Sequence, residues 1–364
     1  MYEKDGHNYF VVDTHAHFWD ASRENWKPGR EEYAKGWIEC FYGYHQLGPP
    51  ETHWDFEKYL KVSEDDFVRD MFTEGHVDVA IFQSTYLKDW YTDGFNTLER
   101  NGALAEKYPG KLIANGRWDP RDGEKGLEQL EADAERWHLK GVKLYTAEWQ
   151  DGSRGWKLTD PMSYRYLEKC QELGIVNQHV HKGPTIWPLN KDAFDVSDID
   201  QVATDFPRLN FIVEHSGIPR IDDFCYIAVQ EPNVYAGVSV VIGALMHARP
   251  KFFARVMGEL LFWVGEDRMT FGGDYNIWVP KWQVEGFVDW QMPDDDAFTD
   301  YPRLTVNAKK KILGLNAAKL YDIPIPEGLG LEEAAATAGQ QTPPAQQTEP
   351  VQQTATADHL VAGQ

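Results

Sequence analysis

Short apolar runs alternate with longer amphipathic segments along the chain. In the segment 126–138, for example, Leu127, Leu130 and Ala134 recur at the three- to four-residue spacing of a helix with one buried face. The apolar runs are short and rich in Val, Ile, Phe and Tyr, which favours strands. They occupy residues 9–13, 77–84, 111–118, 141–146, 175–181, 210–216, 234–240 and 269–275.

Eight strands that alternate with helices predict parallel βαβ units and an α/β fold, a (β/α)8 TIM barrel. An open, doubly wound sheet is the main alternative, but no Gly-rich nucleotide-binding motif follows any of these strands. We expect the barrel domain to span residues 1–330, with a long insertion rich in Trp, Tyr and Phe after strand 1, at about residues 18–66. Residues 331–364 are rich in Gln, Thr, Ala and Pro and are expected to form a disordered tail.

Charge and composition exclude several classes of partner. The 364 residues include 58 Asp and Glu against 36 Lys and Arg, a net charge of −22, which opposes binding to nucleic acid. No run of about 18 apolar residues is present, so a membrane span is not expected. Three widely spaced cysteines (Cys40, Cys170 and Cys225) form no disulfide framework, and residues 1–8 lack the apolar stretch of a secretion signal. We therefore expect a cytoplasmic protein.

Candidate catalytic side chains gather at the ends of the predicted strands, where TIM barrels carry their active sites. They are His15 and His17 after the first run, His179 and His181 in the fifth, His215 in the sixth and Asp274 in the eighth. Two glycines, Gly272 and Gly273, precede the aspartate and indicate close approach of the backbone there.

The first pair of histidines is the sharpest signal. Residues two apart in a strand point the same way, so His15 and His17 can face one metal ion, and Asp13 can support a ligating ring. His179 and His181 share a face by the same rule. His181 lies nearer the strand end and is the preferred ligand, which leaves His179 as a substrate contact or a packed side chain.

At this point the sequence resembles the amidohydrolase-related family of the amidohydrolase superfamily, in the branch that includes aminocarboxymuconate-semialdehyde decarboxylase. The matching segments are VVDTHAHFW (11–19), GVKLY (141–145), HVHKG (179–183), FPRLNFIVEHSG (206–217), VGEDRMTFGGDY (264–275) and ILGLNAAKLYDI (312–323). They occur in the order that the family has.

The resemblance implies a single divalent metal held by His15, His17, His181 and Asp274, with His215 as the catalytic histidine and Asp13 as a supporting residue. It also implies a homodimer. Three imidazoles and one carboxylate suit Zn²⁺ best, with Mn²⁺, Fe²⁺ or Co²⁺ as alternatives. Lys143 is either a structural lysine or, as in binuclear relatives, a carboxylated bridge between two metals; the rest of the pattern favours the structural role.

Substrate contacts are less specific. Arg117 and Arg220 follow strand ends and are candidates to hold a substrate carboxylate, with a structural ion pair as the alternative for each. Trp118, Tyr145 and Trp278 are candidate pocket walls, with simple packing as the alternative. The insertion at residues 18–66 is expected either to cap the pocket or to form a dimer contact.

Three functions remain open. The leading hypothesis is metal-dependent hydrolysis of an amide, lactone or C–C bond in a small aromatic or cyclic carbonyl compound, with Asp274 and His215 as catalytic residues. The alternative is non-oxidative decarboxylation of an aromatic or enoic acid. A non-catalytic metal-binding scaffold is the third interpretation.

Overall fold

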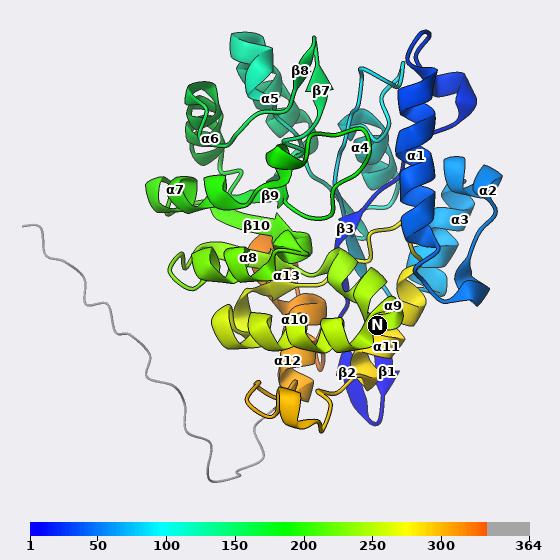
Figure 1. Ribbon diagram of the computed structural model, residues 1–364, viewed down its shortest axis with the longest axis vertical. Helices are drawn as coiled ribbons and strands as arrows, with labels where there is room; N and C mark the ends of the chain where they lie inside the picture. Colours follow the sequence, from blue (N-terminus) through cyan, green and yellow to red (C-terminus); the bar gives the residue numbers. More distant parts are fainter. Residues whose placement is uncertain (333–364) are drawn as a thin grey trace, which may run out of the picture. The chain divides into compact units, whose positions relative to one another are not determined.

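The computed structural model of the chain describes residues 1–332, in which strands and helices alternate (Figure 1). The strands are β1 (Tyr2–Lys4), β2 (His7–Tyr9), β3 (Val12–Ala16), β4 (Val79–Phe82), β5 (Leu112–Ala114), β6 (Gly141–Leu144), β7 (Trp149–Gln150), β8 (Ser153–Arg154), β9 (Asn177–His181), β10 (Asn210–Glu214), β11 (Val234–Gly237) and β12 (Met269–Thr270). The α-helices are α1 (Glu31–His45), α2 (Phe56–Leu60), α3 (Glu64–Val68), α4 (Leu98–Lys107), α5 (Gly123–Trp137), α6 (Pro161–Leu173), α7 (Ser197–Asp205), α8 (Ile221–Ala228), α9 (Met246–Ala248), α10 (Pro250–Trp263), α11 (Pro280–Asp289), α12 (Val306–Lys310) and α13 (Asn316–Tyr321). The α/β class is therefore confirmed. The tail predicted at residues 331–364 lies outside the described residues, except for its first two.

Two parallel sheets organise the strands. One has five strands in the order β12-β11-β10-β9-β6, and the other has three in the order β3-β4-β5. In the larger sheet Glu214, at the end of β10, lies opposite His181 of β9 and Gly237 of β11. The carboxyl ends of these strands therefore lie at one level, which gathers their terminal side chains at one edge.

The two sheets meet at both sides through isolated parallel bridges. Gly116 pairs with Val142, and Ala16 pairs with Tyr275. The strands thus follow the order that a TIM barrel requires, from β3 through β6 and β9 to β12. Closure into one continuous barrel stays a prediction, because single bridges rather than full ladders join the sheets.

The start of the chain differs from the prediction. β1 and β2 form an antiparallel hairpin around Asp5 and Gly6, which have φ values of 52° and 79°. Such an Asp-Gly turn is typical of two-residue hairpins. The first strand of the parallel sheets is consequently residues 12–16 rather than 9–13, and His15 lies inside it.

The insertion after the first barrel strand is helical and contributes to the core. It contains α1, α2 and α3, and α1 packs against α2 (Figure 1). The Trp19 ring stacks on Phe95 at 5.1 Å, and the Trp37 ring lies 4.5 Å from Phe41. The insertion is therefore anchored by buried aromatic side chains rather than laid over the surface.

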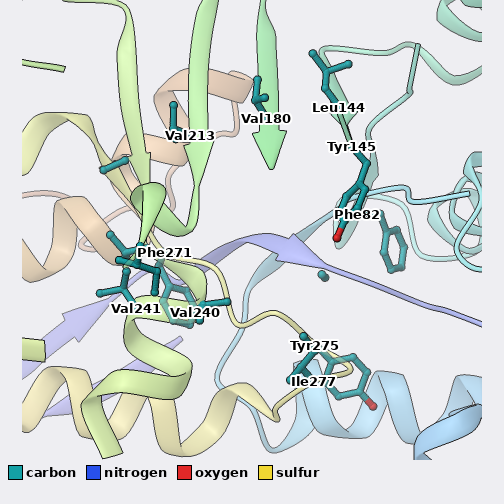
Figure 2. Close-up of a cluster of buried hydrophobic side chains, with 14 of the residues drawn as sticks. Phe82, Leu144, Tyr145, Val180, Val213, Val240, Val241, Phe271, Tyr275 and Ile277 are labelled. Atoms are coloured by element: carbon teal, nitrogen blue, oxygen red, sulfur yellow. The ribbon is translucent and has the colours of Figure 1, made fainter. Parts of the chain in front are cut away.

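Apolar side chains from several strands pack together in the buried core. Figure 2 shows Leu144, Val180 and Val213 on β6, β9 and β10 as part of a buried hydrophobic cluster. On the outside, α8 packs against both α7 and α10 (Figure 1). In the described part of the chain no helix is long and apolar enough to cross a membrane.

Candidate metal centre

A narrow cavity opens at the carboxyl ends of the parallel strands. Its polar floor is formed by His15 and His17 from β3 and its end, His181 from β9, His215 after β10 and Asp274 after β12, all of them buried. Its walls are apolar and aromatic: Phe41, Tyr44, Phe95, Tyr145, Pro184, Ile186, Val240, Ile277 and Trp278. The structure thus brings together the five side chains that the sequence predicts as ligands and catalytic groups. A narrow apolar cavity with a few converging polar groups is typical of a small-molecule site.

The aspartate lies among the histidines. Asp274 Oδ1 is 3.2 Å from His17 Nε2 and 3.8 Å from His15 Nε2, and its Oδ2 is 3.8 Å from His215 Nδ1. One ligand atom each from His15, His215 and Asp274 lies within 4.8 Å of the other two. This tightest cluster includes His215, which the sequence predicted as a catalytic group rather than as a ligand.

Two further histidines border the cluster. The His17 Nδ1 lies 2.7 Å from the backbone oxygen of Gln83, so it carries the proton and leaves Nε2 free to face Asp274. His181 Nδ1 lies 3.1 Å from His215 Nε2, while His181 Nε2 is buried and has no hydrogen-bond partner in residues 1–332. An orphaned imidazole nitrogen at the floor of a cavity is accounted for by a bound metal or ligand.

The charges of these groups suit a divalent cation. Burial lowers the pKa of His15 to about 4 and that of His215 to about 3, and it lowers the pKa of His181 well below its usual value. The imidazoles are therefore neutral at pH 7, as metal ligands must be. Burial opposes ionisation of Asp274, but the neighbouring His15 and His17 outweigh it and hold the pKa of this carboxyl below its usual value. Neutral imidazoles around one carboxylate form a donor set that fits a divalent metal.

Two of these residues have unusual backbone conformations. His215 and Asp274 have φ values of 64° and 54°, in the left-handed region that non-glycine residues seldom occupy. Each such residue costs about 1–3 kcal/mol, and strain of this kind concentrates at functional sites.

Asp13 joins the first and the last strands. Its Oδ1 accepts hydrogen bonds from the backbone N–H of His15 and of Gly273, each at 2.9 Å. Burial raises the pKa of Asp13 to about 7. A Cβ on Gly272 would lie 2.6 Å from His15 Cβ, which confirms the predicted close approach of the backbone. Asp13 thus positions the backbone, whereas the ring of His15 meets a different carboxylate.

That carboxylate belongs to Glu214, which sequence reasoning missed. Its Oε2 lies 2.8 Å from His15 Nδ1, and its Oε1 lies 2.5 Å from His179 Nδ1. The available signal was an acidic residue that ends an apolar strand directly before His215. The other ring nitrogen of His179 meets the Tyr321 hydroxyl at 2.8 Å, so His179 lies beneath the cavity and does not line it.

Three predicted substrate contacts also lie away from the cavity. Arg117 pairs with Asp119, Asp122 and Glu148. Trp118 is buried between Trp156 and Tyr166. Arg220 is exposed and pairs with Asp195 and Asp223. The ion-pair and packing alternatives therefore describe these residues, whereas the predicted pocket walls Tyr145 and Trp278 line the cavity.

The insertion supplies part of the cavity wall through α1. Phe41 and Tyr44 line the cavity, and the Tyr44 hydroxyl donates to the backbone oxygen of Thr185 at 3.2 Å. His45 Nδ1 lies 2.6 Å from the backbone oxygen of Ile277 on the opposite wall. Helix α1 therefore caps one side of the cavity, which is the first of the two roles expected for the insertion at residues 18–66.

Comparisons with known proteins agree with this geometry. A family model described as amidohydrolase matches residues 12–323. An uncharacterised TIM-barrel protein from Bordetella bronchiseptica superposes with a TM-score of 0.62 at 18% identity, covering 86% of this chain and 98% of that one. A putative 2-pyrone-4,6-dicarboxylic acid hydrolase from Pseudomonas putida gives a TM-score of 0.54 at 15% identity, covering 88% and 100%.

A third solved structure contains a metal. The 5-carboxyvanillate decarboxylase from Novosphingobium aromaticivorans, complexed with manganese and 4-hydroxy-3-methoxy-5-nitrobenzoic acid, gives a TM-score of 0.53 at 18% identity, covering 86% of this chain and 96% of that one. No curated protein matches the chain significantly. At these identities the solved structures establish the similarity of fold, and the reaction must be argued from the site.

Proposed function

This chain belongs to the amidohydrolase family, and from that premise we propose that it is a metal-dependent hydrolase of a small aromatic or cyclic carbonyl compound. The observation that carries the proposal is the carboxylate of Asp274, whose oxygens lie 3.2–3.8 Å from the rings of His15, His17 and His215 at the floor of an apolar cavity. We assign His15, His17, His181 and Asp274 as ligands of one divalent metal, with Zn²⁺ favoured by three imidazoles and one carboxylate. When bound, such a cation polarises a carbonyl oxygen and lowers the pKa of water.

The hydrogen bonds support separate roles for His181 and His215. If His181 offers its orphaned Nε2 to the metal as a neutral ring, its Nδ1 carries the proton and donates to His215 Nε2. The proton of a neutral His215 then lies on Nδ1, which is 2.7 Å from Ser239 Oγ and 3.8 Å from Asp274 Oδ2. His215 is thereby left as an N–H donor rather than a ligand, in line with a catalytic role.

The hydrolysis assigns one task to each catalytic residue. Asp274 takes a proton from water as the water oxygen bonds to the carbonyl carbon. His215 Nδ1–H donates to the carbonyl oxygen as negative charge develops there. The proton then passes to the leaving nitrogen or oxygen as its bond to carbon breaks, or to the leaving carbon in the case of a C–C bond.

The cavity walls favour a ring as substrate. Phe41, Phe95, Tyr145 and Trp278 provide aromatic surface, and Lys143 is the one Lys or Arg among the described residues that line the cavity. Two carboxylates on a substrate would therefore meet few positive side chains. We propose an uncharged or singly charged substrate.

Lys143 favours decarboxylation as a second candidate. Its ammonium lies 3.3 Å from His15 Nε2, where it can pair with the carboxylate of an aromatic or enoic acid. In that reaction a proton is added to the substrate carbon that bears the carboxylate, and the C–C bond breaks as CO₂ leaves. The name of the similar 5-carboxyvanillate decarboxylase indicates that it acts on an aromatic acid.

Parallel assays of the metal-loaded chain test the two reactions. One panel contains lactones and anilides, with release of the acid measured; the other contains hydroxybenzoic acids, with release of CO₂ measured. We expect metal-dependent turnover in the first panel and its loss in Asp274→Asn and His215→Asn. Turnover confined to the second panel would replace the hydrolase by the decarboxylase, and turnover in neither would contradict both.

A further inference from the structure

A row of buried polar side chains lies directly beneath the metal centre. It runs from Asn115, after β5, through Tyr321 of α13 and His179 of β9 to Glu214 of β10, and it ends at His15. Neighbouring members are within hydrogen-bond distance of each other. The row connects α13 to the cavity floor.

Glu214 is the one anion in this row. Its side chain is fully buried, with Oε1 2.5 Å from His179 Nδ1 and Oε2 2.8 Å from His15 Nδ1. Removing a carboxylate from water is costly unless donors face it on both oxygens. His179 Nδ1 provides a hydrogen-bond donor for Oε1, whereas His15 Nδ1 lies at ion-pair distance from Oε2 without the geometry of a hydrogen bond in residues 1–332.

The tautomer of His15 follows from its two neighbours. At 2.8 Å a carboxylate oxygen and a bare imidazole nitrogen would repel each other, so His15 Nδ1 must carry a proton. On the other side of the ring Lys143 Nζ lies 3.3 Å from His15 Nε2, and an ammonium group can only donate. Both contacts therefore leave the lone pair on Nε2, which faces Asp274.

We propose that Glu214 is a positioning residue that holds the His15 ring with Nδ1 protonated and Nε2 directed at the metal centre. His179 holds the second oxygen of Glu214 in place from below. The inference rests on the proposed metal site, and it assigns to Glu214 the carboxylate role that sequence reasoning gave to Asp13. Carboxylates that accept the second N–H of a ligating histidine typically contribute 10- to 100-fold to metal affinity.

The first measurement needs no metal. In the metal-free chain labelled with ¹⁵N-histidine, long-range ¹H–¹⁵N spectra distinguish the two imidazole tautomers, and loss of a signal in His15→Asn assigns His15. We expect the Nδ1–H form in the natural sequence and a shift toward the Nε2–H form in Glu214→Leu, which removes the acceptor. Glu214→Gln keeps a neutral acceptor of the same shape and is expected to fall between the two.

The second measurement is metal affinity, by calorimetric titration of Zn²⁺ and of Mn²⁺ into the metal-free variants. We expect affinity to fall in the order natural chain, Glu214→Gln, Glu214→Leu, with a loss of about 10- to 100-fold in the last. Tyr321→Phe is the matched control, because it removes the partner of His179 and leaves both contacts of Glu214 in place. It is expected to lower stability and to keep the affinity within about threefold.

A folded Glu214→Leu that retains the Nδ1–H form and an affinity within about twofold of the natural chain would overturn the proposal. If that variant does not fold, an unchanged affinity in Glu214→Gln does so instead. An equal loss in Tyr321→Phe would also overturn it, because the effect would then be a general loss of core packing. Should the natural chain bind neither metal, the proposed function fails, while the tautomer of His15 still decides the role of Glu214.

Discussion

Alanine at Gly273 tests how closely the metal centre depends on the contact between the first and last strands. A Cβ at this position would lie 2.5 Å from Asp13 Oδ2, and real Cβ contacts below 3.0 Å essentially do not occur. The carboxylate must therefore move by at least 0.5 Å, the difference between these two distances. Because Asp13 Oδ1 accepts from the N–H of both His15 and Gly273, the movement displaces the backbone at both ligand-bearing segments.

We expect Gly273→Ala to lose about 1–3 kcal/mol of unfolding free energy, the usual cost of over-packing a core. The displacement of both ligand-bearing segments is also expected to weaken metal binding. Urea denaturation and calorimetric titration of Zn²⁺ into the metal-free chain measure the two effects. A variant that matches the natural chain in both would refute the role given to Asp13.

Gly43→Ala is the matched control for this experiment. Gly43 lies in α1, and a methyl group at this position would have no neighbouring atom within 4 Å, so alanine there should raise stability by about 0.4–1 kcal/mol. It should leave metal affinity unchanged, because the added methyl group contacts nothing near the cavity.

Three further predictions follow from the surroundings of the cavity. Burial lowers the pKa of His45, so its contribution to stability is present above about pH 6.5 and is lost as pH falls below that value; His45→Gln should flatten the fall in urea-denaturation stability between about pH 7 and pH 5. Gly36→Ala places a methyl group 2.0 Å from the Trp187 ring and must displace that ring. Hydrogen exchange at residues 184–190 should therefore become faster than in Gly43→Ala, and equal rates in the two variants would contradict the contact. Arg220 is exposed and forms ion pairs with Asp195 and Asp223, so Arg220→Ala should change neither metal affinity nor unfolding free energy measurably. A large loss of metal affinity in this variant would contradict the assignment of Arg220 to a surface ion pair.

The positions of the candidate ligands could be predicted from the sequence because the backbone alone determines them. In parallel strands of one sheet the carboxyl ends meet, so His181, His215 and Asp274 were expected together although they are far apart in the chain. The β1–β2 hairpin was missed, although its Asp5-Gly6 turn was a readable signal. That error displaced the first predicted parallel strand by three residues, but His15 and His17 still line the cavity.

The partners of each side chain could not be predicted in the same way, because they depend on packing between segments that are distant in sequence. His179 and His181 share a face of β9, yet two residues along a strand is about 6.6 Å, enough to separate the cavity floor from the layer beneath it. Arg117 follows a strand end like a substrate contact, but Glu148, from a distant segment, joins the neighbouring Asp119 and Asp122 in pairing with it. Alternation places a residue on a face, whereas its depth and its partners follow from tertiary structure.

The metal content of the chain purified without added metal tests the account most directly. Elemental analysis should find roughly one transition-metal ion per chain, with zinc favoured by the donor set, and much less in a folded His15→Asn variant. Less than about half an equivalent in the natural chain, with no uptake on titration, would contradict the claim that His15, His17, His181 and Asp274 share one cation.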